Sequence, residues 1–90
     1  MIEIVKVIGV DRLGGFRLRL RFSDGTEGER DFSDVVESSG PMGVPLREPG
    51  FFGRVFLEHG VLTWPNGYDM DSIALHQEMK AAGQLHRSAA

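Results

Sequence analysis

The sequence contains no cysteine, and this absence excludes three kinds of chemistry at once. Without a thiol the chain can form no disulfide, no thiolate metal site and no cysteine nucleophile. Long apolar runs are missing too, since no segment approaches the roughly 20 apolar residues that cross a bilayer. Residues 1–10 include Glu3 and Lys6 and have no small-residue cleavage site, so they do not read as a signal peptide. We therefore expect a cytoplasmic protein that packing alone stabilises.

An excess of basic residues is also missing. The 10 lysines and arginines are outnumbered by 13 aspartates and glutamates, which gives a formal net charge of -3. This balance argues against a surface built for nucleic acid, because phosphate binding needs a concentration of lysine and arginine. The hydrophobic fraction of 41% and the six phenylalanines are ordinary for a globular protein. The length and composition predict one domain, at residues 1–83.

The clearest pattern present is the faultless alternation of apolar residues and arginines in residues 16–22. Alternate side chains of a strand lie on one face, so the pattern predicts a half-buried strand. A two-residue turn after it would bring Glu27 and Glu29 to the apolar face, which is unfavourable. A three-residue turn, with Gly25 in the left-handed conformation, avoids this. It forms three cross-strand charge pairs on the solvent face: Arg17 with Asp31, Arg19 with Glu29 and Arg21 with Glu27.

Other segments have the composition of strands and short helices. Residues 2–10 are rich in β-branched side chains and predict a first strand. Residues 55–64, with a turn at His59 and Gly60, predict a second hairpin. Between the two hairpins, a short helix over residues 34–38 and another over residues 49–54 are expected.

Three further predictions concern the segment between the two hairpins. Ser33 has the chemistry to cap the first short helix, and Pro49 suits the first position of the second. The Gly- and Pro-rich residues 38–45 between the helices predict a loop, with Leu46 as its anchor in the core.

The last helix is expected at residues 72–82, where the composition favours a helix and Asp71 or Ser72 can cap it. Gly83 would end this helix, and residues 84–90 have little to bury and predict a disordered tail. The inner face of the helix is expected at Leu75, Met79 and Ala82. The fold class is therefore α+β: a small antiparallel sheet of about five strands in two hairpins, packed with two or three short helices.

No constellation of residues predicts catalysis, a metal or a cofactor. Asn66, Asp69 and Asp71 bring three oxygen donors together, but their spacing does not match a calcium loop and no bidentate glutamate completes it. Ser72 and His76 stand beside Asp71, yet no strained turn exposes the serine and no oxyanion hole is suggested. Turn formation and helix capping explain these residues better, and an enzyme that uses Asp69, Asp71 or His76 is the least favoured interpretation.

Two surfaces are candidates for binding a macromolecule. The row of Arg17, Arg19 and Arg21 could follow a nucleic-acid backbone, although the expected acidic partners neutralise it. The second surface follows the second hairpin, where Trp64 and Tyr68 combine a large ring with a polar group. Its residues are Trp64, Asn66, Tyr68, Asp69 and Asp71.

The order of these motifs resembles a known family. The segments LRLRFSDGTEGERDFSDVV and VPLREPGFFGRVFLEHGVLTWPNGYDMDSIAL are similar to the bacterial family catalogued as domain of unknown function 2442, over about residues 3–78. The resemblance implies a compact α+β fold with antiparallel strands and short helices, found alone or fused to a helix-turn-helix domain. It also implies a small uncharacterised protein encoded nearby, in an arrangement similar to toxin and antitoxin pairs. The family has no established catalytic residues to carry over.

The leading hypothesis is therefore a protein-interaction module, the antitoxin-like or regulatory half of a two-protein system. Its expected partner is another small protein encoded nearby, and a homo-oligomer stays open. Nucleic-acid binding through the arginine row is the alternative.

Overall fold

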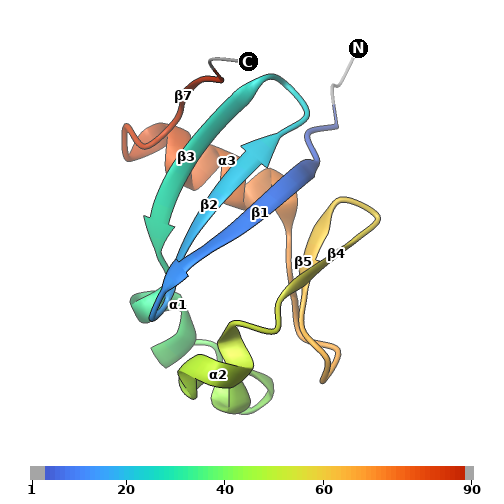
Figure 1. The fold of residues 1–90 in the computed structure, drawn as a ribbon, viewed down its shortest axis with the longest axis vertical. Coiled ribbons are helices and arrows are strands. Elements are labelled where there is room, and N and C mark those ends of the chain that lie inside the picture. The colour runs from blue at the N-terminus through green and yellow to red at the C-terminus, as the bar shows by residue number, and fades with distance from the viewer. Residues whose placement is uncertain (1–3, 89–90) are drawn as a thin grey trace.

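The alternating segment lies inside a four-stranded antiparallel sheet. In the computed structural model, which describes residues 4–88, it forms strand β2 (Arg17–Phe22). Strands β1 (Val7–Gly14) and β3 (Thr26–Asp31) pair with β2 on either side, and β7 (His86–Arg87) adds to the outer edge of β3. Figure 1 shows β1, β2 and β3 side by side, with helix α3 behind them.

The predicted hairpin register is confirmed. Gly25 has a φ of 88°, as the three-residue turn requires. Opposite each other on the outer face are Arg17 and Asp31, Arg19 and Glu29, and Arg21 and Glu27. The inward side chains of β2 are fully buried: Leu18, Leu20 and Phe22. The alternation therefore predicted the strand, and the acidic residues after the turn predicted its register.

The first strand lies later in the chain than the predicted residues 2–10. Strand β1 runs from Val7 to Gly14, and residues 1–3 lie outside the described part. Polar residues at its end, such as Asp11, become extended because they pair with β2. Backbone pairing therefore extended the strand beyond its β-branched stretch.

The second hairpin forms a separate sheet rather than extending the first. Its strands are β4 (Phe56–Glu58), β5 (Val61–Thr63) and β6 (Asp69–Met70), in that order. The predicted turn between β4 and β5 is confirmed, with positive φ at His59 and Gly60. The α+β class is thus confirmed, whereas the single sheet of about five strands is replaced by sheets of four and three strands within residues 4–88.

Three short helices connect the sheets: α1 (Ser33–Glu37), the 3-10 helix η1 (Pro41–Arg47) and α2 (Pro49–Phe52). Segment η1 was expected to be a loop, and its anchor Leu46 is fully buried as predicted. Pro49 opens α2, as the sequence indicated.

Of helices α1 and α2, only α2 has a carboxylate cap. Ser33 does not cap α1, because it is the first residue of the helix and Phe32, at the N-cap, makes no side-chain cap hydrogen bond. Asp31 Oδ1 instead accepts hydrogen bonds from the Ser33 backbone N–H at 2.9 Å and from its hydroxyl. These bonds, with a smaller contribution from Arg17, hold the pKa of Asp31 below its usual range. At α2, the Glu48 carboxylate accepts from the backbone N–H groups of Gly50 and Phe51.

Helix α3 (Ser72–Ala81) covers the inner face of the first sheet (Figure 1). Asp71 caps it by accepting from the Ile73 backbone N–H at 3.1 Å. The buried residues are Ser72, Leu75 and Met79, whereas the expected third member, Ala82, lies beyond the helix and is exposed. Gly83 follows with a φ of 71°. No helix in residues 4–88 has the length and apolarity needed to cross a membrane.

Phe52 is the centre of the aromatic core. Its ring centroid lies 5.3 Å from that of Phe16, 6.0 Å from that of Phe32 and 5.6 Å from that of Trp64. The Phe52 carbonyl also accepts the Trp64 indole N–H at 2.9 Å. The ring chain continues to Tyr68, 5.9 Å from Trp64. One aromatic cluster therefore joins the first sheet, α2 and the second sheet.

The chain after α3 differs from the predicted disordered tail, as far as it is described. His86–Arg87 pair with β3 as strand β7, and Leu85 packs against the core. The segment reaches β3 by passing over Gly28, which is buried. A side chain at Gly28 would overlap the Gln84 carbonyl oxygen, so glycine at this position lets the backbone approach. The sequence showed no sign of this contact because it depends on two segments distant in sequence.

We expect Gly28→Ala to destabilise the protein by about 1 to 3 kcal/mol, because the added methyl group must push the backbone at Gln84 away. Urea unfolding would measure the loss. The matched control is Gly53→Ala, where a methyl group meets only ordinary contacts and φ is -66°. We expect its free energy of unfolding to stay within about 0.5 kcal/mol of the parent. Equal stability of the two variants would contradict the close approach at Gly28.

Candidate functional site

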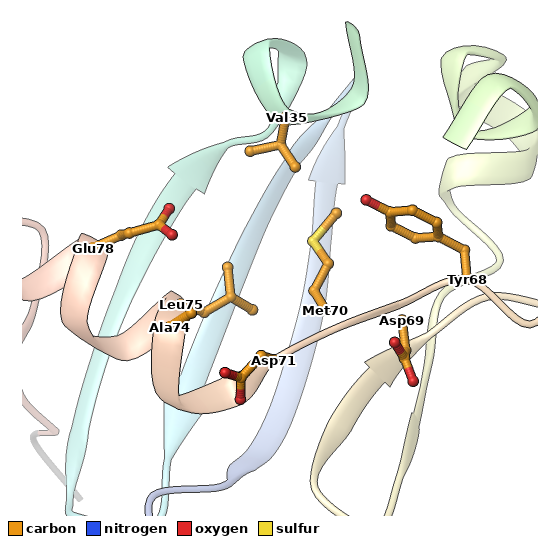
Figure 2. Close-up of a pocket in the computed structure, with 8 residues that line it drawn as sticks. All are labelled: Val35, Tyr68, Asp69, Met70, Asp71, Ala74, Leu75 and Glu78. Carbon is orange, nitrogen blue, oxygen red and sulfur yellow. The ribbon is translucent and has the colours of Figure 1, made fainter. Parts of the chain in front are cut away.

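A pocket of about 230 Å³ opens where β6 runs into α3, below helix α1 (Figure 2). Its apolar lining consists of Val35, Met70, Ala74 and Leu75. Its polar lining consists of Tyr68, Asp69, Asp71 and Glu78. The pocket is therefore a shallow depression with an apolar side and an acidic rim, and none of its lining residues is basic.

Tyr68 forms one wall of the pocket and is held in place by its neighbours. Its ring packs edge-on against Trp64, and its backbone N–H donates to Asn66 Oδ1 at 3.2 Å. Figure 2 shows its hydroxyl pointing towards Val35 and Met70. The contact with Trp64 thus holds the Tyr68 ring in place, and the hydroxyl lies on the side of the residues that line the pocket.

The acidic residues of the rim differ in what they bind within the protein. Asp71 uses Oδ1 for the cap of α3, and Glu78 uses Oε1 to accept from Arg30 Nη2 at 2.9 Å. The Asp69 carboxylate points away from Tyr68 in Figure 2 and is exposed. The Arg30 guanidinium lies over the ring of the buried Phe32, 5.2 Å from its centroid. This contact helps to fix the position of the group that pairs with Glu78.

Two exposed apolar residues lie next to this pocket on η1. Met42 is 53% exposed and Val44 is 50% exposed. Asn66 Nδ2 donates to the Met42 carbonyl at 2.9 Å, and a Cβ atom at Gly43 would lie 3.8 Å from Tyr68 Cε2. Segment η1 and the wall of the pocket are therefore in contact. We call Met42, Val44, Asn66, Tyr68, Asp69 and Asp71 together the η1/β6 surface.

The structure corrects one member of the predicted interaction surface. Trp64 is only 1% exposed, and its indole N–H is bonded to Phe52, so it belongs to the core. The polar group that suggested an interface instead satisfies a buried carbonyl. The other four predicted residues, from Asn66 to Asp71, lie together at the pocket or beside it.

Met42, Val44 and Glu78 were missed by the sequence reasoning. Two apolar residues in a Gly- and Pro-rich loop show no periodicity, so their exposure was not foreseeable from their pattern. The nearest available signal was that Met42 and Val44 had no assigned place in the core. Glu78 had no signal, because its pairing with Arg30 brings together residues 48 positions apart.

Ser72, Asp71 and His76, which were considered for catalysis, each bond to a different part of the fold. The Ser72 hydroxyl donates to the Val5 carbonyl at 2.9 Å, and Asp71 caps α3. His76 Nε2 lies 2.7 Å from Asp24 Oδ2, in the turn between β2 and β3. Within the described residues, no group of three histidine, aspartate or glutamate side chains is arranged to hold a metal ion.

The arginine face carries a balanced set of charges. Glu29 forms ion pairs with Arg17 at 2.9 Å and with Arg19 at 3.2 Å. On the other side, Asp11 of β1 stands opposite Arg19. The three arginines thus share the outer face with four acidic residues: Asp11, Glu27, Glu29 and Asp31.

The fold and the site define a small α+β protein with an open, acidic-rimmed pocket beside exposed apolar residues. Residues 7–80 match the family described as "Protein of unknown function (DUF2442)". The chain belongs to this family, which confirms the resemblance seen in the sequence. No curated protein and no solved structure matches the chain.

The Asp24–His76 contact links the first hairpin to α3 and should make stability depend on pH. Burial alone would raise the pKa of Asp24, but hydrogen bonds from the Thr26 hydroxyl and backbone N–H, with the contact to His76, lower it below 3.8. A lowered pKa means that the ionised carboxylate stabilises the folded state above the unfolded pKa. This contribution disappears as the pH falls through the folded pKa.

We expect Asp24→Asn to lower the free energy of unfolding by about 1 kcal/mol at pH 7. The difference should shrink as the pH falls through the folded-state pKa of Asp24, because the carboxyl group of the parent then becomes protonated too. Urea unfolding at a series of pH values from 7 downwards would measure it. The control is Asp34→Asn on the exposed part of α1, where we expect only a few tenths of a kcal/mol. A loss that does not decrease as the pH falls would contradict a stabilising carboxylate.

Proposed function

We propose that this protein is a protein-interaction module that binds a second small protein through the η1/β6 surface. The partner is a protein encoded near its own gene, and the pair forms an antitoxin-like or regulatory two-protein system in the cytoplasm. The η1/β6 surface replaces the predicted set by leaving out Trp64 and adding Met42 and Val44.

One observation carries this proposal: segment η1, which contacts the Tyr68 wall of the pocket, carries two exposed apolar side chains. Met42 and Val44 are each at least half exposed. Single apolar residues on a surface are common, but exposed apolar residues on a segment that borders a pocket are typical of interaction sites. Methionine and tyrosine are both enriched in interfaces: methionine is flexible and adapts to its partner, and tyrosine combines a large ring with a polar group.

Hydrogen bonds hold the apolar residues to the pocket wall. The Asn66 side chain joins both halves, since it donates to the Met42 carbonyl and accepts from the Tyr68 N–H. A surface held this way loses little conformational freedom when it binds. The arrangement therefore supports binding by a preformed surface.

Nucleic-acid binding through Arg17, Arg19 and Arg21 is the alternative, and the balanced charge of that face weighs against it. Ion pairs with Glu29 already use two of the arginines. A phosphate backbone would have to displace these pairs and approach four acidic residues on the same face.

We expect no retardation of DNA or RNA by the full chain in a mobility assay at about 50 mM salt, where electrostatic binding is strong. The variant Glu29→Gln should also show none, because Asp11, Glu27 and Asp31 remain. Retardation that Arg19→Glu abolishes and that higher salt weakens would support the alternative function.

The interaction is tested by co-expressing the chain with the product of the adjacent gene. We expect the two proteins to elute as one complex in size-exclusion chromatography. Elution of each protein alone, with no heat of binding in calorimetry, would contradict the proposed pair. A complex that contains only copies of this chain would also contradict it, because the partner would then be the chain itself.

We expect Met42→Ser and Val44→Ser each to weaken the complex about fivefold to tenfold, because each removes apolar contact area at the interface. Calorimetric titration would measure the affinity. The matched control is Ile8→Ser on β1, since Ile8 is 61% exposed but lies outside the η1/β6 surface. No loss of affinity in the two η1 variants, or an equal loss in Ile8→Ser, would contradict an interface at the η1/β6 surface.

A further inference from the structure

We propose that the pocket between β6 and α3 receives the side chain of a lysine or arginine from the partner protein. This inference rests on the proposed function and specifies its chemistry. It depends on the size of the pocket, on its apolar side and on the charge of its rim.

The size of the pocket suits one long side chain. Its volume of about 230 Å³ is below the roughly 300 Å³ at which pockets for drug-sized ligands and cofactors begin. Lysine and arginine bury their methylene stems along apolar surface and keep the charged end near water. Met70 and Leu75 supply such a surface (Figure 2), and the opening leaves the charged end in contact with the rim.

The rim is complementary to a cation. Asp69, Asp71 and Glu78 line it, and no lining residue carries positive charge. Asp71 and Glu78 each use one carboxylate oxygen within the protein, at Ile73 and Arg30, and the other oxygen makes no hydrogen bond among the described residues. Those oxygens can accept from an ammonium or guanidinium group.

Tyr68 adds two further means of recognising a cation. Its hydroxyl points towards Val35 and Met70, which line the pocket, and the face of an aromatic ring attracts a positive charge within about 6 Å. The ring is fixed by Trp64, so binding does not have to order it. An acidic side chain, by contrast, would approach carboxylates of like charge at the rim.

The test measures binding of short peptides to the full-length, ¹⁵N-labelled chain by NMR. The probes are acetylated and amidated pentapeptides with leucine at the flanking positions and lysine, arginine, norleucine or glutamate at the centre. Norleucine keeps the apolar stem of lysine and lacks its charge. We expect the lysine and arginine peptides to shift the amide signals of residues 68–79 and to bind at least about fivefold more tightly than the norleucine peptide.

Substitutions of the rim carboxylates test whether their charge causes the preference for basic peptides. We expect Asp69→Asn and Glu78→Gln each to weaken binding of the lysine peptide about twofold to fivefold. Affinity for the norleucine peptide should not change. The matched control is Glu58→Gln on β4, an exposed carboxylate that does not line the pocket. It should leave both affinities unchanged, and unchanged spectra outside the pocket would show that the variants are folded.

Three results would overturn the inference: equal binding of the norleucine and lysine peptides, preferred binding of the glutamate peptide, or no shifts at residues 68–79 with any peptide. The proposed function would survive these results if the partner still bound and Met42→Ser still weakened the complex. If the basic peptides bound and no partner did, the pocket chemistry would stand and the proposed function would fail.

Discussion

The contact between Phe52 and Trp64 is the interaction on which the rest of the structure depends. Their rings pack 5.6 Å apart, and the Phe52 carbonyl accepts the Trp64 indole N–H at 2.9 Å. Aromatic pairs and buried hydrogen bonds each stabilise a protein by about 1 kcal/mol. Here the same pair also fixes geometry, because Phe52 contacts Phe16 and Phe32 near the first sheet, while Trp64 directly follows β5 of the second sheet. Two small sheets thereby share one core.

The η1/β6 surface is held in place by this core. Trp64 supports Tyr68 from behind, and Asn66 ties the same loop to η1. The turn that presents Tyr68 is thus held at both ends, although β6 itself has only two residues. Met42 and Val44 are exposed on η1, the segment that the Asn66 hydrogen bond joins to this loop.

Charge is distributed differently over the two faces that could bind a partner. On the outer face of the first sheet, acids alternate with arginines across the strands, so each charge already has a neighbour of opposite sign. Among the described residues, the acids at the pocket have one such neighbour, Arg30 beside Glu78. Surface ion pairs add little stability, but they reduce the field around the charges that they join. The negative charge at the pocket is consequently less compensated than the charge on the outer face.

The sequence by itself determined the local features: the hairpin register, the turns at Gly25 and at His59–Gly60, the start of α2 at Pro49 and the helix cap at Asp71. Each depends on neighbouring residues and on the period of one element. Tertiary structure alone decided the division into two sheets, the burial of Trp64, the passage of the C-terminal segment over Gly28 and the pocket at Tyr68. These features arise from contacts between segments distant in sequence. The order of residues along the chain does not show which apolar side chains will pack against each other.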